Sequence, residues 1–256
     1  MKNQQKISAL IITFNEIKHI ENVIKNIDFV DEIIVVDSFS NDGTFEKLKQ
    51  LNHVKTIQRE FKNFADQRNF ALQQASSNWI LFIDADERIP KKLKKEILKE
   101  IKNPDETVGF MMKRLYFFKQ KRIRFSGFQT DTTYRLFKNG KVKYLEDKIV
   151  HEMPEINGKS KLLKNNMLHY CFNSSAHYKS KMERYAKLKA LECFNKGKKT
   201  NAYHLYLRPA FKFITNYIIR LGILDGKEGF KICYLSAYGV NYRYRELKKL
   251  WKNSKL

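Results

Sequence analysis

The stretch WILFIDADE, residues 79–87, places an apolar run directly in front of an acidic cluster. An uninterrupted apolar run of this length is typical of a strand buried on both faces of a parallel sheet. Residues 7–13, 32–37 and 54–58 are further strand candidates, and the segments between them have the spacing or the polar turns of helices. Strands and helices therefore alternate up to about residue 90, which predicts a parallel α/β half.

The pattern changes after residue 90. A basic helix is expected up to residue 102, followed by strand-like segments for which we predict mixed or antiparallel pairing. These segments are residues 109–118, 132–139 and 141–145. Beyond residue 172 the chain is expected to be helical to its end, with candidate helices at residues 178–196, 209–224 and 230–252. The predicted fold class is α/β, with a Rossmann-like, mostly parallel sheet, helices on both faces and a helical C-terminal extension.

Polar side chains stand where the candidate strands end. Thr13, Asn15 and Glu16 follow the first strand, Asp37 ends the second, and residues 84–87 follow the fourth. Open parallel sheets bind ligands beyond the carboxyl ends of their strands. We therefore expect these side chains to converge on one crevice.

Asp84 and Asp86 flank Ala85, so two carboxylates project from one tight turn. Mg²⁺ or Mn²⁺ prefers oxygen ligands, and a cation held by one or two carboxylates keeps positions open for diphosphate oxygens. The alternative interpretation is that these aspartates form a turn or cap a helix.

Asp37 also has two interpretations. Its carboxylate can accept hydrogen bonds from a base or a ribose, or it caps the next helix, a role that Ser40 or Asn41 could fill instead. The sequence contains neither a Gly-rich dinucleotide fingerprint nor a P-loop. A nucleotide is therefore not expected to bind as it does in dehydrogenases or P-loop kinases.

The composition predicts an anionic partner. The chain of 256 residues has 50 Lys and Arg against 27 Asp and Glu, a net charge of +23. Nucleic acids, anionic membranes and phosphorylated metabolites are all anionic partners that fit a protein of this charge.

Cys171, Cys193 and Cys233 are odd in number and lack metal-ligand spacing, which favours reduced thiols in a cytoplasmic protein. The apolar stretch at the N-terminus is too short for a signal sequence, so export is not expected.

Four segments in this order and spacing, ISALIITFNE, EIIVVDSFSNDGT, FADQRNFAL and WILFIDADE, resemble the family 2 glycosyltransferases, inverting enzymes of the GT-A fold. The resemblance continues through residues 122–152 and 213–230. The whole pattern is similar to that of the bacterial subgroup that adds sugars to the lipopolysaccharide core. It implies a GT-A catalytic domain over residues 1–172, with a nucleotide-binding half up to about residue 90 and an acceptor-side half after it. Residues 173–256 form the helical extension.

The resemblance implies a metal-dependent transfer of a sugar from a nucleotide diphosphate donor, foremost a UDP-sugar, to a surface glycan or lipopolysaccharide-core acceptor. It assigns Asp86 to the metal, Mg²⁺ or Mn²⁺, and Asp84 to the ribose or the metal. The nucleoside and diphosphate side of the donor site then comprises Thr13, Asn15, Glu16, Asp37, Arg68, Asp84 and Ala85.

An inverting transfer needs a base that takes the proton of the attacking acceptor hydroxyl. Family members with an acidic pair place this base after the later strands, and the matching segment here ends in His151-Glu152. Glu152 is therefore the candidate base, and His151 is expected to orient the acceptor or share the task. The alternative is a surface turn before Pro154, and Glu146-Asp147 upstream is a second acidic pair.

Two further residues have open interpretations. Asp131 binds acceptor hydroxyls or pairs with Arg135. His169 is a further metal ligand, as in some enzymes of this fold, or a core histidine on an apolar strand.

The candidate helix at residues 209–224 has an apolar stripe mixed with basic residues. Such a helix lies on an anionic membrane surface or packs against the catalytic domain. With the basic, aromatic segment at residues 241–256, it predicts a peripheral enzyme on the cytoplasmic face of the membrane that acts on a lipid-linked acceptor.

Two rival functions have weaker support. A nucleotidyltransferase normally has a Gly-rich, basic signature near its N-terminus, and this sequence has none there. Nucleic-acid binding would not explain why the candidate strands end in acidic residues, so no nucleic-acid partner is expected.

Overall fold

The computed structural model describes residues 5–145, 154–172 and 174–254. Its first part alternates strands and helices as predicted: β1 (Ile7–Thr13), α1 (Ile20–Asn26), β2 (Glu32–Asp37), α2 (Thr44–Lys49), β3 (Val54–Gln58), α3 (Phe64–Gln74) and β4 (Trp79–Phe82). The next elements are β5 (Glu87–Arg88), α4 (Lys91–Lys102), β6 (Thr107–Phe118), β7 (Lys121–Ile123), β8 (Thr132–Lys138), β9 (Val142–Tyr144), β10 (Pro154–Ile156), β11 (Lys159–Leu162) and β12 (Met167–Phe172).

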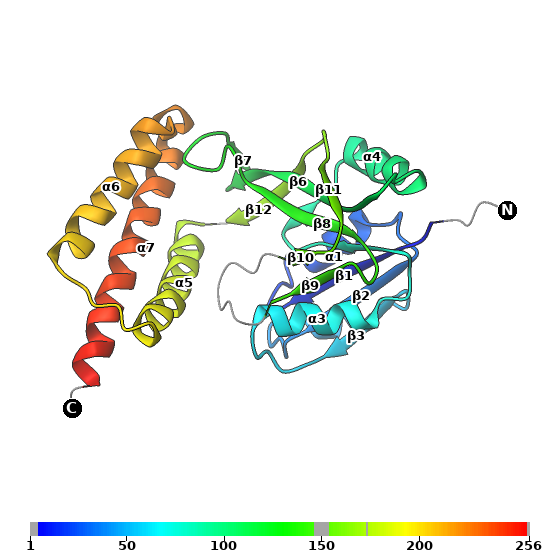
Figure 1. The fold of residues 1–256 in the computed structure, drawn as a ribbon, viewed down its shortest axis with the longest axis horizontal. Coiled ribbons are helices and arrows are strands. Elements are labelled where there is room, and N and C mark those ends of the chain that lie inside the picture. Colours follow the sequence, from blue (N-terminus) through cyan, green and yellow to red (C-terminus); the bar gives the residue numbers. More distant parts are fainter. Residues whose placement is uncertain (1–4, 146–153, 173, 255–256) are drawn as a thin grey trace. The chain divides into compact units, whose positions relative to one another are not determined.

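Most of these strands form one sheet with the order β3-β2-β1-β4-β8-β6-β12-β5. The strands β3, β2, β1 and β4 run parallel, and β8 is antiparallel to both of its neighbours. Additional pairs join β6 to β7 and β11, while β9 and β10 form a separate small sheet (Figure 1). The parallel first half and the mixed second half confirm the predicted α/β fold class.

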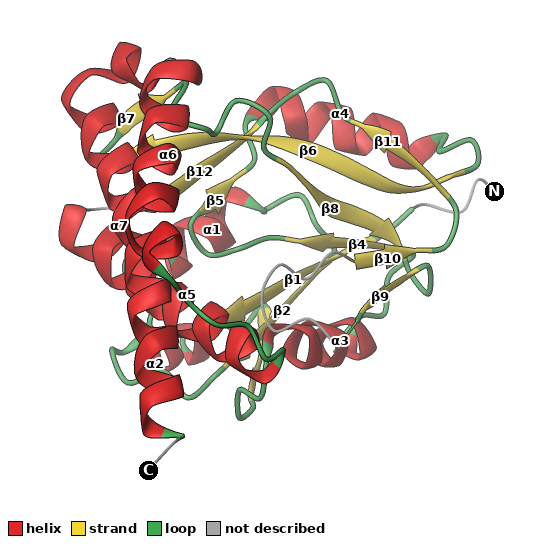
Figure 2. Ribbon diagram, turned by 60° about the vertical axis from the view of Figure 1, so that its left-hand side comes forward, coloured by secondary structure: helices red, strands yellow, loops and turns green. Residues whose placement is uncertain are grey.

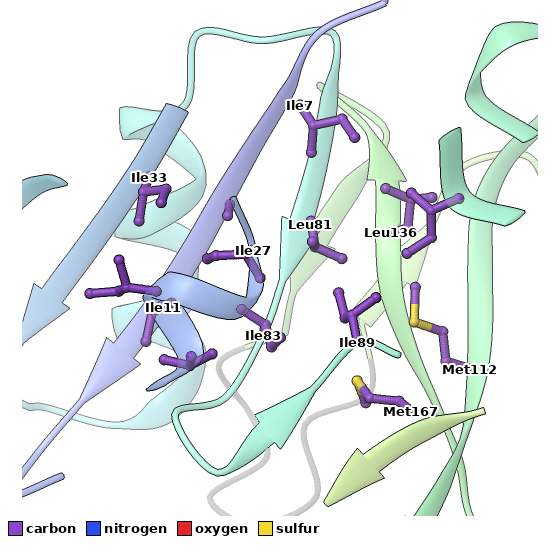
Figure 3. Packing of buried hydrophobic residues seen from close by; sticks show 14 of the residues in the cluster. Ile7, Ile11, Ile27, Ile33, Leu81, Ile83, Ile89, Met112, Leu136 and Met167 are labelled. Carbon is purple, nitrogen blue, oxygen red and sulfur yellow. The ribbon is translucent and has the colours of Figure 1, made fainter. Parts of the chain in front are cut away.

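Both faces of the parallel strands are buried, as their apolar runs predict. On one face, alternate strand residues such as Ile11 and Leu81 pack against apolar residues of α1 and α4 (Figure 3). On the other face, the intervening residues, among them Leu10 and Phe82, pack with Ala65 and Ala71 of α3. The sheet is therefore a rigid platform, and its carboxyl edge is the part left to hold polar groups.

The chain forms two compact units. The first comprises residues 1–114 and 131–169, and the second comprises residues 115–130 and 170–256. The predicted functional division at residue 172 stays a prediction. The second unit contains α5 (Ser175–Asn195), α6 (Arg208–Ile214) and α7 (Gly226–Asn253), and α7 contacts both of the other helices (Figure 2).

The expected continuous helix over residues 209–224 is wrong. One π-helical turn, Tyr203–Leu207, precedes α6, and another, Thr215–Ile219, follows it. The helical run stops at Leu221, which has a positive φ of 55°, before a 3₁₀ turn at Gly222–Asp225. Each π turn adds a residue per turn and shifts the side chains that follow it. Among the described residues, no helix is both long and apolar enough to cross a bilayer.

The turn and α7 approach each other closely. A Cβ atom on Gly229 would lie 2.1 Å from the carbonyl oxygen of Gly222, so only glycine permits this contact. Asp225 also holds residues 124–126, because its carboxylate accepts hydrogen bonds from the Arg124 and Phe125 amides and from the Ser126 hydroxyl. The close approach of Gly229 to Gly222 and the hydrogen bonds of Asp225 therefore fix the backbone between α6 and α7.

Candidate active site at the carboxyl edge of the sheet

The turns after β1 and β2 are hydrogen-bonded to each other. The Asn15 amide donates to Ser40 Oγ at 2.8 Å, and Asn15 Oδ1 accepts from the Asn41 amide at 2.9 Å. The Glu16 amide donates to Thr44 Oγ1 at 2.9 Å. Asn15 has a φ of 58°, a conformation that asparagine tolerates better than most residues. Asn15 and Glu16 therefore help to form one wall at this edge.

Asp37 is fully buried at the end of β2. Its carboxylate accepts hydrogen bonds from the Ser40 amide at 3.0 Å, the Ser40 hydroxyl at 2.5 Å and Gln58 Nε2 at 3.3 Å. The alternative that Asp37, Ser40 or Asn41 caps α2 is wrong, because the residue at the N-cap position is Gly43. Instead Asp42 Oδ1 accepts from the Thr44 amide at 3.0 Å, at the first turn of the helix.

Thr13 pairs with Asp37 in the register of β1 and β2. The Thr13 hydroxyl is buried and has no hydrogen-bond partner among the described residues. An unsatisfied buried hydroxyl is unfavourable unless a ligand or water completes its hydrogen bonds. The roles of Thr13, Asn15, Glu16 and Asp37 around a nucleoside stay predictions.

Two arginines contact Asp84 at the end of β4. Arg68 Nη2 lies 3.2 Å from Asp84 Oδ1, and Arg135 donates to Asp84 Oδ2. Burial alone would raise the pKa of the Asp84 carboxyl, but Arg135 and Arg68 hold that pKa well below its usual range. The Arg68 guanidinium also lies over the rings of Phe82 and Tyr144. Asp84 is thus an oriented carboxylate that is ionised at neutral pH.

Glu87 extends this network into the core. Its side chain is fully buried, it accepts from Arg135 at 2.7 Å and from the Asp84 amide at 3.0 Å, and Arg114 Nη1 lies 3.7 Å away. Asp131 accepts from Arg114 Nε at 2.5 Å. The alternative that Asp131 pairs with Arg135 is therefore wrong, because Arg135 is directed to Asp84 and Glu87. Whether Asp131 binds an acceptor stays a prediction.

His169 and Asp86 lie side by side. The antiparallel pairing of β5 and β12 places His169 opposite Glu87, the residue after Asp86. His169 Nε2 then lies 3.3 Å from Asp86 Oδ2. The sheet therefore joins two residues that are 83 positions apart in the chain. Ala85 between the two aspartates is buried, and its carbonyl accepts from Arg88 at 2.7 Å.

The Asp86–His169 pair fits a divalent cation in its donor atoms, one carboxylate oxygen and one imidazole nitrogen. Among the described residues, no group of three or more His, Cys, Asp or Glu side chains is arranged to hold a metal. Mg²⁺ and Mn²⁺ sites that bind substrate phosphates use few protein ligands. The pair therefore suits a cation that the substrate helps to hold, and metal ligation by Asp86, Asp84 and His169 stays a prediction.

The candidate base Glu152 and its neighbour His151 lie outside the described residues, as does the upstream pair Glu146-Asp147. Their assigned roles stay predictions. The three cysteines lie within the described part, and all are free thiols.

Arg68 was predicted as a site residue, but the other two arginines of the network, Arg114 and Arg135, were not. Arg135 stands in the apolar strand segment TYRLF, and Arg114 stands in MKRLYF. A guanidinium on a buried strand requires carboxylate partners, so these arginines signalled an acidic neighbour. Phe14 and Phe39 also follow the strand ends, and both residues are about half exposed.

Comparisons with known proteins agree with this architecture. A family model described as glycosyl transferase family 2 matches residues 8–161. An uncharacterised glycosyltransferase of Rickettsia felis is 30% identical over 98% of this chain and 92% of its own length. The lipopolysaccharide core biosynthesis glycosyltransferase LpsC of Rhizobium meliloti is 27% identical over 93% of both chains.

A solved structure supports the fold. The mannosyltransferase PcManGT from Pyrobaculum calidifontis, in complex with GDP-Man and Mn²⁺, has a TM-score of 0.55 at 14% identity, over 97% of this chain and 88% of its own. At this identity the likeness concerns the fold, which is of the expected GT-A type. The strand-end architecture and the family match over more than half of the chain lead to one conclusion: the chain belongs to glycosyl transferase family 2.

Proposed function

We propose that the chain is an inverting, metal-dependent glycosyltransferase that moves a sugar from a nucleotide diphosphate sugar, foremost a UDP-sugar, to a bacterial surface-glycan or lipopolysaccharide-core acceptor. The observation that carries the proposal is the Asp86–His169 pair beside the arginine-bound Asp84 at the carboxyl edge of the sheet. The name of the Rhizobium relative supports the acceptor class, and the Mn²⁺ and GDP-Man of the archaeal neighbour support the donor class.

Each group has a role in the proposed reaction. Asp86 and His169 would hold Mg²⁺ or Mn²⁺, which supplies positive charge against the leaving diphosphate. Arg68 and Arg135 keep Asp84 ionised and orient it toward a ribose hydroxyl or the cation. The Thr13 hydroxyl donates to the nucleoside.

The acceptor side supplies the proton transfer. Glu152 takes the proton of the attacking hydroxyl, His151 orients the acceptor, and Asp131, fixed by Arg114, binds a second hydroxyl. Replacing Glu152→Gln abolishes sugar transfer and leaves donor binding unchanged, because the amide keeps the shape but cannot take a proton. The matched control is Glu155→Gln, at an exposed position of β10, which retains activity. Full turnover by Glu152→Gln would refute the assignment.

The donor is tested by thermal unfolding with UDP-, GDP-, CMP- and dTDP-sugars, with and without Mn²⁺. A donor present at a hundred times its Kd adds about 2.7 kcal/mol to the free energy of unfolding. We expect the increase to require Mn²⁺ and to disappear in Asp86→Asn, while Asp28→Asn, at an exposed site, behaves as wild type. Absence of stabilisation by every donor contradicts the proposed function.

We further propose that the enzyme works as a peripheral protein on the cytoplasmic face of the membrane. Support comes from the segment around α6, where Phe211, Ile218 and Leu224 are each more than half exposed. Part of the apolar stripe is thus exposed, although Tyr217 packs against Phe213 and Phe230.

A further inference from the structure

A pocket of about 360 Å³ lies in the helical unit between the segment around α6 and the middle of α7. Its principal lining residues are Tyr203, Arg208, Phe211, Lys212, Arg220 and Arg243. Four of these are cations, and none of the described lining residues is acidic. The pocket is far in sequence from the strand-end residues, and the reaction proposed above does not use it.

The described residues offer these four cations no acidic partner. Within the described part of the chain, none of Arg208, Lys212, Arg220 and Arg243 forms an ion pair. Arg208 and Arg243 instead donate to the Tyr244 hydroxyl and lie over its ring, with centroid distances of 5.7 and 4.5 Å. A neutral phenol therefore orients both guanidiniums, and their positive charge is not neutralised.

Two donors of the pocket are also unsatisfied. Thr215 Oγ1 and Arg243 Nε are buried and have no hydrogen-bond partner among the described residues, and the same holds for one acceptor of the lining, Asn216 Oδ1. Burial, and then the charge of Arg220, lower the pKa of Lys212. An anion with several oxygen acceptors would satisfy these donors and relieve the repulsion between the cations. Phosphate has this chemistry.

The segment that contributes three of these cations also carries exposed apolar side chains. Eight apolar residues within residues 207–224 are each at least 46% exposed: Leu207, Phe211, Ile214, Ile218, Ile219, Leu221, Ile223 and Leu224. Single exposed apolar residues are ordinary, but a succession along one segment marks an interaction surface. Cations beside exposed aliphatic and aromatic side chains match the boundary between lipid headgroups and acyl chains.

We propose that this pocket binds the phosphate of an anionic phospholipid headgroup, while the apolar side chains of residues 207–224 enter the adjacent acyl region. The inference rests on the membrane part of the proposed function and is independent of the transfer chemistry. Phospholipid is favoured over a second copy of this chain because the charge of the pocket is positive and needs an anion.

Vesicle flotation tests the headgroup site. The full chain is mixed with phosphatidylcholine vesicles that contain or lack phosphatidylglycerol, at low and physiological salt. We expect binding that requires phosphatidylglycerol, and about 30-fold weaker binding for Lys212→Gln/Arg220→Gln, since each surface cation contributes about one factor of five. The control Lys91→Gln/Lys95→Gln removes the same charge from exposed positions of α4 and should change binding by less than about threefold.

A second pair of variants tests the apolar part. Phe211→Ser/Ile218→Ser should lose most binding while all four cations remain, whereas Leu98→Ser/Leu162→Ser, at exposed positions elsewhere, should bind as wild type. Equal losses in test and control variants would overturn the proposal, as would equal binding to neutral vesicles.

Two other outcomes also overturn it. Complete displacement from vesicles by millimolar inorganic phosphate would assign the pocket to free phosphate. A dimer in sedimentation velocity that Phe211→Ser/Ile218→Ser dissociates would assign the apolar surface to a second copy. The donor-dependent thermal shift, measured on the same variants, separates these failures from failure of the glycosyltransferase assignment.

Discussion

Six charged side chains at the carboxyl edge of the sheet neutralise one another, whereas the four cations between α6 and α7 meet no carboxylate in the described part of the chain. At the sheet edge, Arg68, Arg114 and Arg135 face Asp84, Glu87 and Asp131. In the helical unit, the Tyr244 hydroxyl takes the place of an acid for two of the four cations, Arg208 and Arg243. A charge balanced by the chain itself orients a site, and a charge left unbalanced is available to a ligand.

The largest effect on stability is expected when a cation is removed at the sheet edge, and removal of a cation in the helical unit should have almost none. Arg135→Met leaves Asp84 and Glu87 without their shared partner, so the free energy of unfolding should fall by about 3–5 kcal/mol. Arg220→Gln removes a cation that has no acid to balance, and the change should stay within about 0.5 kcal/mol. Urea unfolding at neutral pH measures both. Similar values for the two variants would show that the network does not differ energetically from the pocket.

The next effect concerns catalysis. Asp86→Asn should lower kcat/KM for sugar transfer roughly a hundredfold, because charge stabilisation of the leaving group is lost. His169→Gln should lower it about 10- to 100-fold and raise the Mn²⁺ concentration needed for half-maximal rate. Release of nucleoside diphosphate with a soluble acceptor analogue is the measurement. Unchanged Mn²⁺ dependence in both variants contradicts metal binding by this pair.

The third effect concerns how the stability contributed by Asp84 depends on pH. The pKa of Asp84 is lowered in the folded state, so its contribution is present above the unfolded value of about 3.9 and is lost as pH falls toward the folded pKa. Asp84→Asn should be about 1.5–3 kcal/mol less stable at pH 7. Its stability should then decline less than that of wild type between pH 4 and pH 2. Parallel curves for the two proteins would contradict the role of Asp84.

The smallest effect is expected at a surface pair of the helical unit. Hydrogen bonds from Lys196 and Lys189 lower the pKa of Glu192 to about 2. The Lys196 side chain is 61% exposed, so water screens the pair. Glu192→Gln should therefore cost only about 0.5 kcal/mol at pH 7, and the difference should vanish as pH falls from 4.5 to 2. A cost above about 1.5 kcal/mol would show that exposed pairs here are as strong as the buried network.

Much of the fold could be predicted from local sequence. The apolar runs ending at Thr13, Asp37 and Ile83 each predict a buried strand, and the polar residues after them predict a site at one sheet edge. The resemblance predicted the family from four short segments. These features depend on near neighbours in the chain, so they can be read without tertiary contacts.

Long-range pairing decided the rest. Asp86 and His169 meet only because β5 pairs with β12, and Arg135 selects Asp84 and Glu87 rather than the nearby Asp131 because β8 lies next to β4. The interruptions around α6 and the exposure of its apolar side chains were likewise not predictable from periodicity, which indicates one continuous helix. The sequence by itself determined strand ends, charge and family, since these follow from local order. Only the tertiary structure decided which charges are balanced, because that depends on strand pairing across long separations.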